Sequence, residues 1–229
     1  MLGARKGKFD SSGKAVAIPG SNIPLSAAGV LILWLGWFGF NGGSVLSADP
    51  ANTSLVLVTT CLAAAAGGLG ATFLSTLMYK NLDITMFMNG VLGGLVGITA
   101  GADQMGPTSA IIIGAIGGAV VVLGVALLDK CKLDDPVGAI PVHLFAGIWG
   151  TLAVGLFGAS AGFDQFMVQL ASVGIVGVFC VIGAAIIALI VKSIMGLRVS
   201  DEEEEIGLDI SEHGTCLLYT SPSPRDGTK

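Results

Sequence analysis

The stretch "DDPVGAIPVHLFAGIWGTLAVGLFG", Asp134–Gly158, decides the fold class because it is a long apolar run. Within this run it carries a single histidine, His143. After Asp135, no Asp, Glu, Lys or Arg occurs until Asp164. The run is long enough for the helix of roughly 20 residues that crosses the hydrocarbon core of a membrane. An imidazole in such a segment needs an explanation, and the explanation depends on the rest of the chain.

The chain as a whole is much more apolar than a soluble domain. Of its 229 residues, 53% are hydrophobic and 12% are charged, with a mean hydropathy of +0.84. Soluble domains carry about 25% charged residues. The long uncharged stretches predict membrane spans at approximately 25–42, 54–79, 84–102, 108–128, 137–158 and 168–195. We therefore expect an all-α fold, a polytopic bundle of six transmembrane helices embedded in a lipid membrane.

The loops between the predicted spans indicate the orientation of the chain. Lys and Arg precede the first span, follow the second, fourth and sixth spans, and are missing from the other loops, which carry Asp49, Asp103 and Asp164. The positive-inside rule therefore predicts that both ends of the chain are cytoplasmic. We expect a multi-pass protein of the cell (plasma) membrane.

Composition also divides the chain into four parts. Residues 1–24 form a polar cytoplasmic segment, 25–197 the transmembrane domain and 198–214 an acidic cytoplasmic tail. The last part, 215–229, reads "TCLLYTSPSPRDGTK", which resembles translated cloning sequence and is expected to be a non-native tail. The net charge of -5 comes mainly from "DEEEE" in the acidic tail, so it gives no indication of nucleic-acid binding.

The predicted span that contains His143 has small residues on one side. At 100° per residue, Ala139, Ala146, Gly147 and Gly150 fall near His143 together with Ile140, whereas Val142, Phe145, Ile148, Trp149 and Leu152 fall on the other side. We expect the small-residue face to turn toward other helices or a lumen. His143 is then either a structural hydrogen-bonding histidine or part of a substrate or proton pathway. An apolar site favours the neutral imidazole, which offers one donor and one acceptor.

A second notable segment is "WLGWFGFNGGS", residues 34–44, at the outer end of the first span. Phe40 and Ser44 are four residues apart and therefore share a helical face. An aromatic ring beside a hydroxyl group suits a small cation, through cation–π attraction and one hydrogen bond. The alternative is that these aromatic residues only anchor the helix at the membrane interface.

Three motifs in order resemble the ammonium transporter family (Amt/Mep/Rh). "GWFGFNGGS" is similar to the family's "GWFGFNxGS", and "DDPVGAIPVHLFAGIWG" to its "DDPxxxxxVHxxxGxxG" histidine helix. "GLDISEHG" is similar to its cytoplasmic signature. The resemblance runs from about residue 1 to residue 214 and covers only what looks like family spans six to eleven. It implies an inverted-repeat fold of eleven helices, so this chain looks like an incomplete half of its parent.

The resemblance also implies roles for individual residues. His143 matches the second-repeat pore histidine, Phe40 the gate phenylalanine and Ser44 the hydroxyl of the outer ammonium site. Asp134 and Asp135 match the acidic pair at the start of the histidine helix. Trp37 lies in a matching motif without an assigned role. Gly138 stands where bacterial members often carry an acid. The implied assembly is a homotrimer that conducts ammonium, ammonia or methylammonium through a narrow hydrophobic pore in each subunit.

The tail motif implies regulation. The matching positions are Gly207, Asp209, Ser211, His213 and Gly214. Ser211 falls where related eukaryotic members carry a phosphorylatable threonine. A phosphate there would repel the neighbouring carboxylates. Lys80, Lys130 and Lys132 are expected docking partners of the tail, with a solvated, disordered tail as the alternative. A cytosolic PII-type regulator is a further expected partner.

Other function classes remain open or are disfavoured. An ammonium sensor without substantial flux, a structural membrane protein and a transporter of another small solute are the alternatives. Catalysis is disfavoured because the sequence has no nucleophile–base arrangement, no phosphate-binding loop and no metal-ligand spacing. We therefore expect neither an enzyme nor a bound cofactor or metal.

Overall fold

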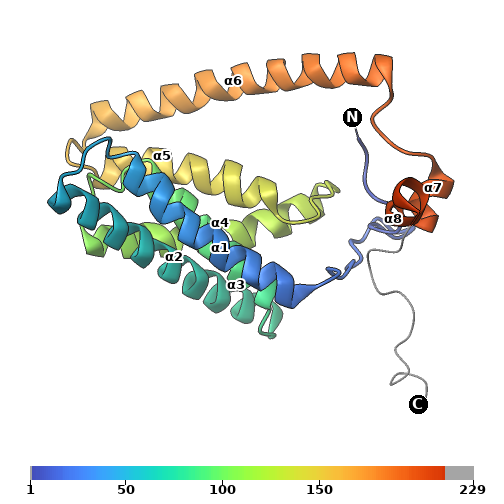
Figure 1. Ribbon diagram of the computed structural model, residues 1–229, viewed down its shortest axis with the longest axis horizontal. Helices are drawn as coiled ribbons and strands as arrows, with labels where there is room; N and C mark the ends of the chain where they lie inside the picture. Colours follow the sequence, from blue (N-terminus) through green and yellow to red (C-terminus); the bar gives the residue numbers. More distant parts are fainter. Residues whose placement is uncertain (1, 215–229) are drawn as a thin grey trace. The chain divides into compact units, whose positions relative to one another are not determined.

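The computed structural model describes residues 2–214, so the expectation for 215–229 lies outside the described residues. Helices account for the regular structure of this part, apart from one isolated β-bridge between Phe9 and Ala15. The elements are α1 (Ile23–Gly43), α2 (Pro50–Tyr79), α3 (Ile84–Thr99), α4 (Pro107–Lys130), the π-helix η1 (Ile140–Phe145), α5 (Ala146–Phe157), α6 (Phe163–Ile194), α7 (Asp201–Ile206) and α8 (Leu208–His213). Figure 1 shows them in chain order by colour. The all-α prediction is confirmed.

Five of the six predicted spans are helices long and apolar enough to cross a membrane: α1, α2, α4, η1 with α5, and α6. The exception is the span predicted at 84–102, which is helical only over the 16 residues of α3. Such a helix measures about 24 Å, less than the hydrocarbon thickness of about 30 Å. The helix ends early because the chain turns at Gly101, whose N–H donates to the carbonyl of Ile98.

The helix starts are encoded locally. Asn22 caps α1 by accepting the N–H of Leu25, and Asp49 caps α2 by accepting the N–H of Asn52. Asp83 does the same for α3. Each side-chain oxygen satisfies an N–H group that the first helical turn leaves without a carbonyl partner.

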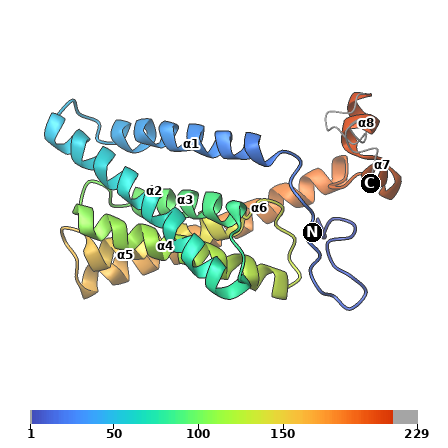
Figure 2. The ribbon, with the colours of Figure 1, turned by 90° about the horizontal axis from the view of Figure 1, so that it is seen from below.

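Residues 22–180 form one compact unit, in which α2, α3 and α4 pack closely (Figures 1 and 2). Glycine makes this approach possible. A Cβ atom at Gly94 would collide with the carbonyl of Ala63, and one at Gly118 with the carbonyl of Gly67. Small residues let helix backbones touch, which is a main source of helix association in membranes. The glycines therefore allow a tight bundle of these three helices.

The core continues from this contact toward one end of the bundle. Val56, Ile98, Met105, Ile113 and Val154 form its main apolar cluster, with contributions from α2 to α5. The indole rings of Trp34 and Trp37 on α1 pack against a smaller cluster of α2 and α3 residues. The packing therefore fixes α1 and α5 against the three central helices.

The second compact unit comprises, among the described residues, 2–21 together with 181–214. Lys6 holds the acidic helix α7: its Nζ lies 2.8 Å from Glu205 Oε1, and its backbone N–H donates to Glu204 at 2.8 Å. Arg198 pairs with Glu204 at 2.7 Å. The hydrogen bond to Glu205 raises the pKa of Lys6, and the hydrogen bonds from the Lys6 backbone and from Arg198 lower the pKa of Glu204. No local sequence pattern identifies Lys6 or Arg198 as partners of the tail.

We predict that Gly118→Ala destabilises the protein, because the added methyl group must push the backbone of α2 away from α4. Overpacking of this kind costs about 1–3 kcal/mol. Gly174→Ala is the matched control, since a Cβ atom there meets no described atom within 4 Å. Thermal unfolding of the purified protein in detergent measures both variants. Equal unfolding temperatures for the two would contradict the backbone contact described here.

Candidate functional site

His143 lies in η1, the one π-helical turn of the described residues. The turn is set by the hydrogen bond from the N–H of Ala146 to the carbonyl of Pro141, five residues back. His143 is exposed, although Pro141 and Val142 beside it are buried. Single π-turns are rare inside helices and are found frequently at functional sites. The histidine therefore sits at an irregular point of a membrane-length helix, on a surface that the described residues leave uncovered.

Asp135 begins this helix. Its carboxylate accepts the N–H groups of Gly138 and Ala139, both at 3.0 Å, and of Ile140 at 2.7 Å. One side chain thus satisfies three backbone donors that have no partner in the first turn. Asp134 is half-buried beside it. Its predicted role at the helix start stays a prediction.

Gly138 has a structural reason to be glycine. Its φ of +78° lies in the region that residues with a Cβ atom rarely adopt, and the residue is buried. A Cβ atom at this position would stand 2.7 Å from Nδ2 of Asn89, which donates to the carbonyl of Val137. An acidic side chain at this position would therefore disturb the entry into η1.

The predicted helix face around His143 is wrong in part. Gly150 lies against the backbone of Gly97 and Ala146 is buried, so both residues face the bundle while His143 does not. Phe145 packs against Gly124, and Trp149 donates its indole N–H to the carbonyl of Ile113, so both face α4. The residues exposed with His143 are Ala139, Ile140 and Leu144. The helical wheel assumed 100° per residue throughout, whereas the π-turn changes the angular spacing of η1.

The phenylalanine–serine segment forms the end of α1. Phe40 is 60% exposed, and Ser44 follows the last helical residue as its C-cap. The Ser44 hydroxyl donates to the carbonyl of Phe40 at 2.7 Å. Its only proton is used in that bond, so the lone pairs of its oxygen remain available as acceptors. An oxygen acceptor and an exposed aromatic ring, one helical turn apart in the chain, are two groups that suit an N–H-rich cation.

Two long-range hydrogen bonds flank Phe40, and no local sequence pattern predicts them. Trp37 donates its indole N–H to Oγ1 of Thr99 on α3 at 2.8 Å. Asn41, which is buried, donates to Oγ1 of Thr60 on α2 at 3.0 Å. These partners lie 62 and 19 residues away in the chain. No periodicity or motif links them, so sequence reasoning missed both threonines.

The described contacts join Phe40 to Ser44, but none of them joins either residue to His143.

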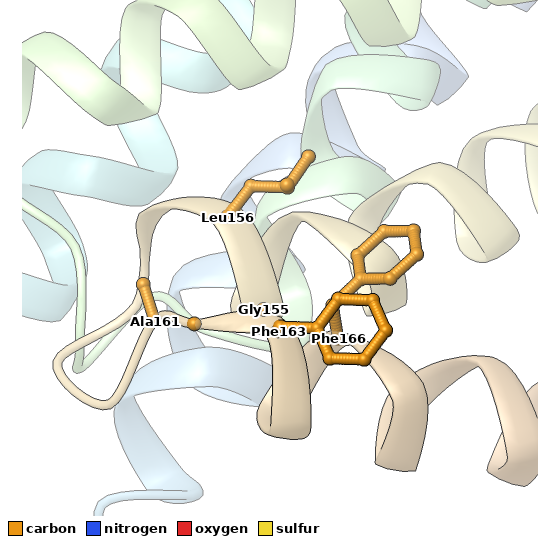
Figure 3. Close-up of a pocket in the computed structure, with 6 residues that line it drawn as sticks. Gly155, Leu156, Ala161, Phe163 and Phe166 are labelled. Atoms are coloured by element: carbon orange, nitrogen blue, oxygen red, sulfur yellow. The ribbon is translucent and has the colours of Figure 1, made fainter.

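The apolar pocket shown in Figure 3 is a separate feature between α5 and α6. Leu156 lines it from α5, and Phe163 and Phe166 line it from α6. None of its lining side chains is polar. It therefore lacks the groups that would orient a polar solute, and we assign the candidate site to the three sequence-predicted residues instead.

The tail residues lie in α8 and at its two ends. Gly207 precedes the helix with a φ of +97°, and Gly214 ends it with a φ of +65°, both values that favour glycine. The hydroxyl of Ser211 is exposed and donates to the carbonyl of Gly207. Asp209 lies in the first turn and His213 in the last. This geometry leaves Ser211 accessible, and its regulatory role stays a prediction.

The model of the Ammonium Transporter Family matches residues 1–216, which includes all three motifs. This chain belongs to the ammonium transporter family. Ammonium transporter Amt2 of Archaeoglobus fulgidus is 42% identical over 231 residues, covering 93% of this chain and 49% of the relative. A putative ammonium transporter of Synechocystis is 40% identical, covering 93% of this chain and 40% of the relative.

Solved structures of ammonium transporter proteins have the same fold. A sensor Amt protein superposes with a TM-score of 0.88 at 34% identity, covering 92% of this chain and 54% of the other. Candida albicans Mep2 superposes with a TM-score of 0.78 at 26% identity, covering 88% of this chain and 48% of the other. The chain spans about half the length of the curated relatives it matches. Its family is one of membrane transporters rather than enzymes.

We predict that Asp135→Ala destabilises the start of the histidine helix, because three N–H groups lose their acceptor. Loss of a capping side chain costs about 0.5–2 kcal/mol. Asp135→Asn should fall between the parent and the alanine variant, since its amide oxygen still accepts hydrogen bonds. Denaturant unfolding in detergent measures the effect, with Asp103→Ala, at an exposed loop residue, as the control for charge removal. An unchanged midpoint for Asp135→Ala would contradict the capping role.

Proposed function

We propose that the full-length protein conducts ammonium across a membrane and that this chain supplies the second half of its pore. Ammonium is selected at Phe40 and Ser44 and then passes His143. The observation that carries this proposal is the position of His143, an exposed imidazole in a π-turn of a helix that is otherwise apolar and of membrane-spanning length. Ionisable groups in membrane spans mark substrate or proton pathways.

The chemistry of the two sites suits a cation that loses a proton on the way. An ammonium ion carries four N–H donors; Ser44 offers it acceptor lone pairs, and the exposed Phe40 ring lies one helical turn away in the chain. Moving a charge into an apolar pore is very costly, whereas a neutral solute crosses far more readily. A neutral imidazole can then donate to or accept from ammonia and methylamine. Ammonium is therefore the recruited species, and ammonia is the species beside His143.

The uncovered surface at His143 supports a two-sided pore. Ala139, Ile140 and Leu144 share this surface and would form an apolar wall. A second wall must come from a segment outside this chain, in the plan of an inverted repeat with a site at the repeat interface. The homotrimer, the plasma membrane location and a cytoplasmic position for both ends of this chain belong to the same proposal. The positive-inside pattern of the loops supports the orientation.

Transport is better supported than sensing without flux. The curated relatives are ammonium transporters by name, and one solved structure with a closely matching fold is a sensor Amt protein. A sensor needs the outer site but no continuous path. Measuring flux and ammonium-dependent tail conformation on the same protein separates the two functions.

We predict that His143→Ala lowers methylammonium uptake by the full-length protein by about tenfold, equivalent to roughly 1.4 kcal/mol on the barrier. The physical reason is the loss of the donor and acceptor that replace water around the solute. His143→Gln keeps one donor and one acceptor group and should retain more activity. His143→Glu introduces a carboxylate and should change ion selectivity. Uptake and ion selectivity that match the parent in all three variants would contradict the proposed role of His143 in conduction.

The tail is proposed to regulate flux through charge. Phosphorylation of Ser211 would add about 1.5–2 negative charges. The nearest acidic residues in the chain are Asp209 and Glu212. The added charge would repel these carboxylates and so disturb the tail conformation that docks on basic groups, among them Lys80, Lys130 and Lys132. A PII-type regulator would use the same cytoplasmic surface. The ion pairs of Lys6 and Arg198 with α7 support an electrostatic mode of tail docking.

We predict that Ser211→Asp lowers ammonium flux several-fold at low salt, whereas Ser211→Ala leaves it unchanged. Screening should reduce the difference at 1 M salt, where the Debye length is about 3 Å. Ser193→Asp is the control, since its hydroxyl also bonds within its own helix but lies outside the tail. Uptake assays on vesicles with the cytoplasmic side accessible measure the effect. If Ser211→Asp transports like the parent at both salt concentrations, negative charge at Ser211 does not regulate flux.

A further inference from the structure

The orientation of Phe40 depends on contacts that α1 makes with its neighbours. The ring of Phe40 is 60% exposed, so packing alone leaves it room to rotate. Its described ring partner is Trp37, one turn earlier, at 5.9 Å between ring centroids and an interplanar angle of 78°. Edge-to-face contacts of this kind have a defined geometry. The position of the Trp37 indole therefore limits the positions of the Phe40 ring.

Trp37 is itself held by Thr99. The Thr99 hydroxyl donates its proton to the carbonyl of Leu95 at 2.7 Å and accepts the indole N–H of Trp37 at 2.8 Å. The proton of the hydroxyl is used within α3, so the oxygen can act toward Trp37 only as an acceptor. The hydrogen bond is half-buried, and it fixes both the side and the tilt of the indole.

The other tryptophan of the same cluster shows that this anchoring is specific. Trp34 packs with Trp37 against Ala64, Val91 and Leu95. Its buried indole nitrogen has no hydrogen-bond partner among the described residues. Packing in this cluster therefore does not require an indole hydrogen bond. Thr99 supplies one only to the tryptophan that contacts Phe40.

We propose that Thr99 is a positioning residue for the outer ammonium site: through Trp37 it holds the Phe40 ring in the orientation that binds the cation. The proposal rests on the proposed function, in which Phe40 contacts ammonium. The Asn41–Thr60 bond fixes the backbone beside Phe40, while the Thr99–Trp37 bond fixes the ring. Thr60 on α2 thus holds the backbone next to Phe40, and Thr99 on α3 holds the indole that contacts its ring.

The test uses methylammonium uptake by the full-length protein, with KM and maximal rate measured separately. Thr99→Val keeps the shape of the side chain but removes the acceptor. We expect KM to rise about two- to five-fold, the size of an exposed cation–π contact, with the maximal rate within about twofold of the parent. Thr99→Ser restores the acceptor and should restore KM. Thr72→Val is the matched control, because Thr72 also bonds a carbonyl one turn back but contacts no indole in the described structure.

A second variant tests the route through Trp37. Trp37→Phe keeps an aromatic ring but removes the indole N–H, so it should raise KM as Thr99→Val does. Combining the two substitutions should add nothing further, because both remove the same hydrogen bond. This variant also covers the case in which Thr99→Val does not fold. A fully additive double variant, or a KM unchanged in both single variants, overturns the proposal.

Two measurements separate this proposal from the function on which it rests. If Phe40→Ala leaves both KM and the maximal rate unaltered, the proposed outer site itself is overturned. Phe40→Ala with a raised KM, beside Thr99→Val with the parent's KM, leaves the outer site intact and overturns only the role of Thr99. In the NMR spectrum, the Trp37 indole N–H should exchange slowly in the parent and in Thr99→Ser and rapidly in Thr99→Val. Slow exchange in Thr99→Val would also overturn the proposal.

Discussion

Backbone contact between the glycines of α2, α3 and α4 is the constraint on which the rest of the bundle depends. Gly67, Gly94 and Gly118 bring three helices so close that a Cβ atom at any of these positions would collide with a neighbouring backbone. In a membrane, lipid competes with apolar side chains for the same contacts, so close packing must supply the association energy. With these helices in place, α1 and the histidine helix each have one surface against which to pack.

The candidate site depends on this framework in two different ways. Phe40 and Ser44 lie at the end of α1, where hydrogen bonds from Trp37 and Asn41 reach α3 and α2. His143 lies on the π-turn that Asp135 begins, and the buried residues beside it turn its ring away from the bundle. Both parts place polar or aromatic groups on exposed surfaces of otherwise apolar helices. The proposed solute path needs a second wall, which the inverted-repeat plan of transporters would supply.

The acidic tail follows a different principle, because its contacts are ionic and exposed. The carboxylates of α7 meet Lys6 and Arg198, two residues far apart in sequence that lie in the same compact unit. Exposed ion pairs contribute little to stability and are screened by salt. Such a contact forms and breaks easily, which is compatible with the regulatory role proposed for the tail.

The sequence alone determined the helical membrane class, five of the six spans and the three motifs. Long apolar runs and charged loops specify spans because each helix satisfies its backbone hydrogen bonds internally. Residues such as Asp49, Asp83 and Asp135 mark helix starts for the same local reason. His143, Phe40 and Ser44 were found as candidates because their side-chain types stand out in apolar motifs, and their roles stay predictions.

Only the tertiary structure decided what each side chain contacts. The π-turn at His143 is not visible in the sequence, so the helical wheel placed Ala146 and Gly150 on the wrong face. The bonds from Trp37 to Thr99 and from Asn41 to Thr60 join different helices, and no local pattern encodes which residues meet. The pairing of Lys6 with α7 is equally non-local. Local periodicity encodes elements, whereas contacts between elements depend on how the glycine-lined helices pack.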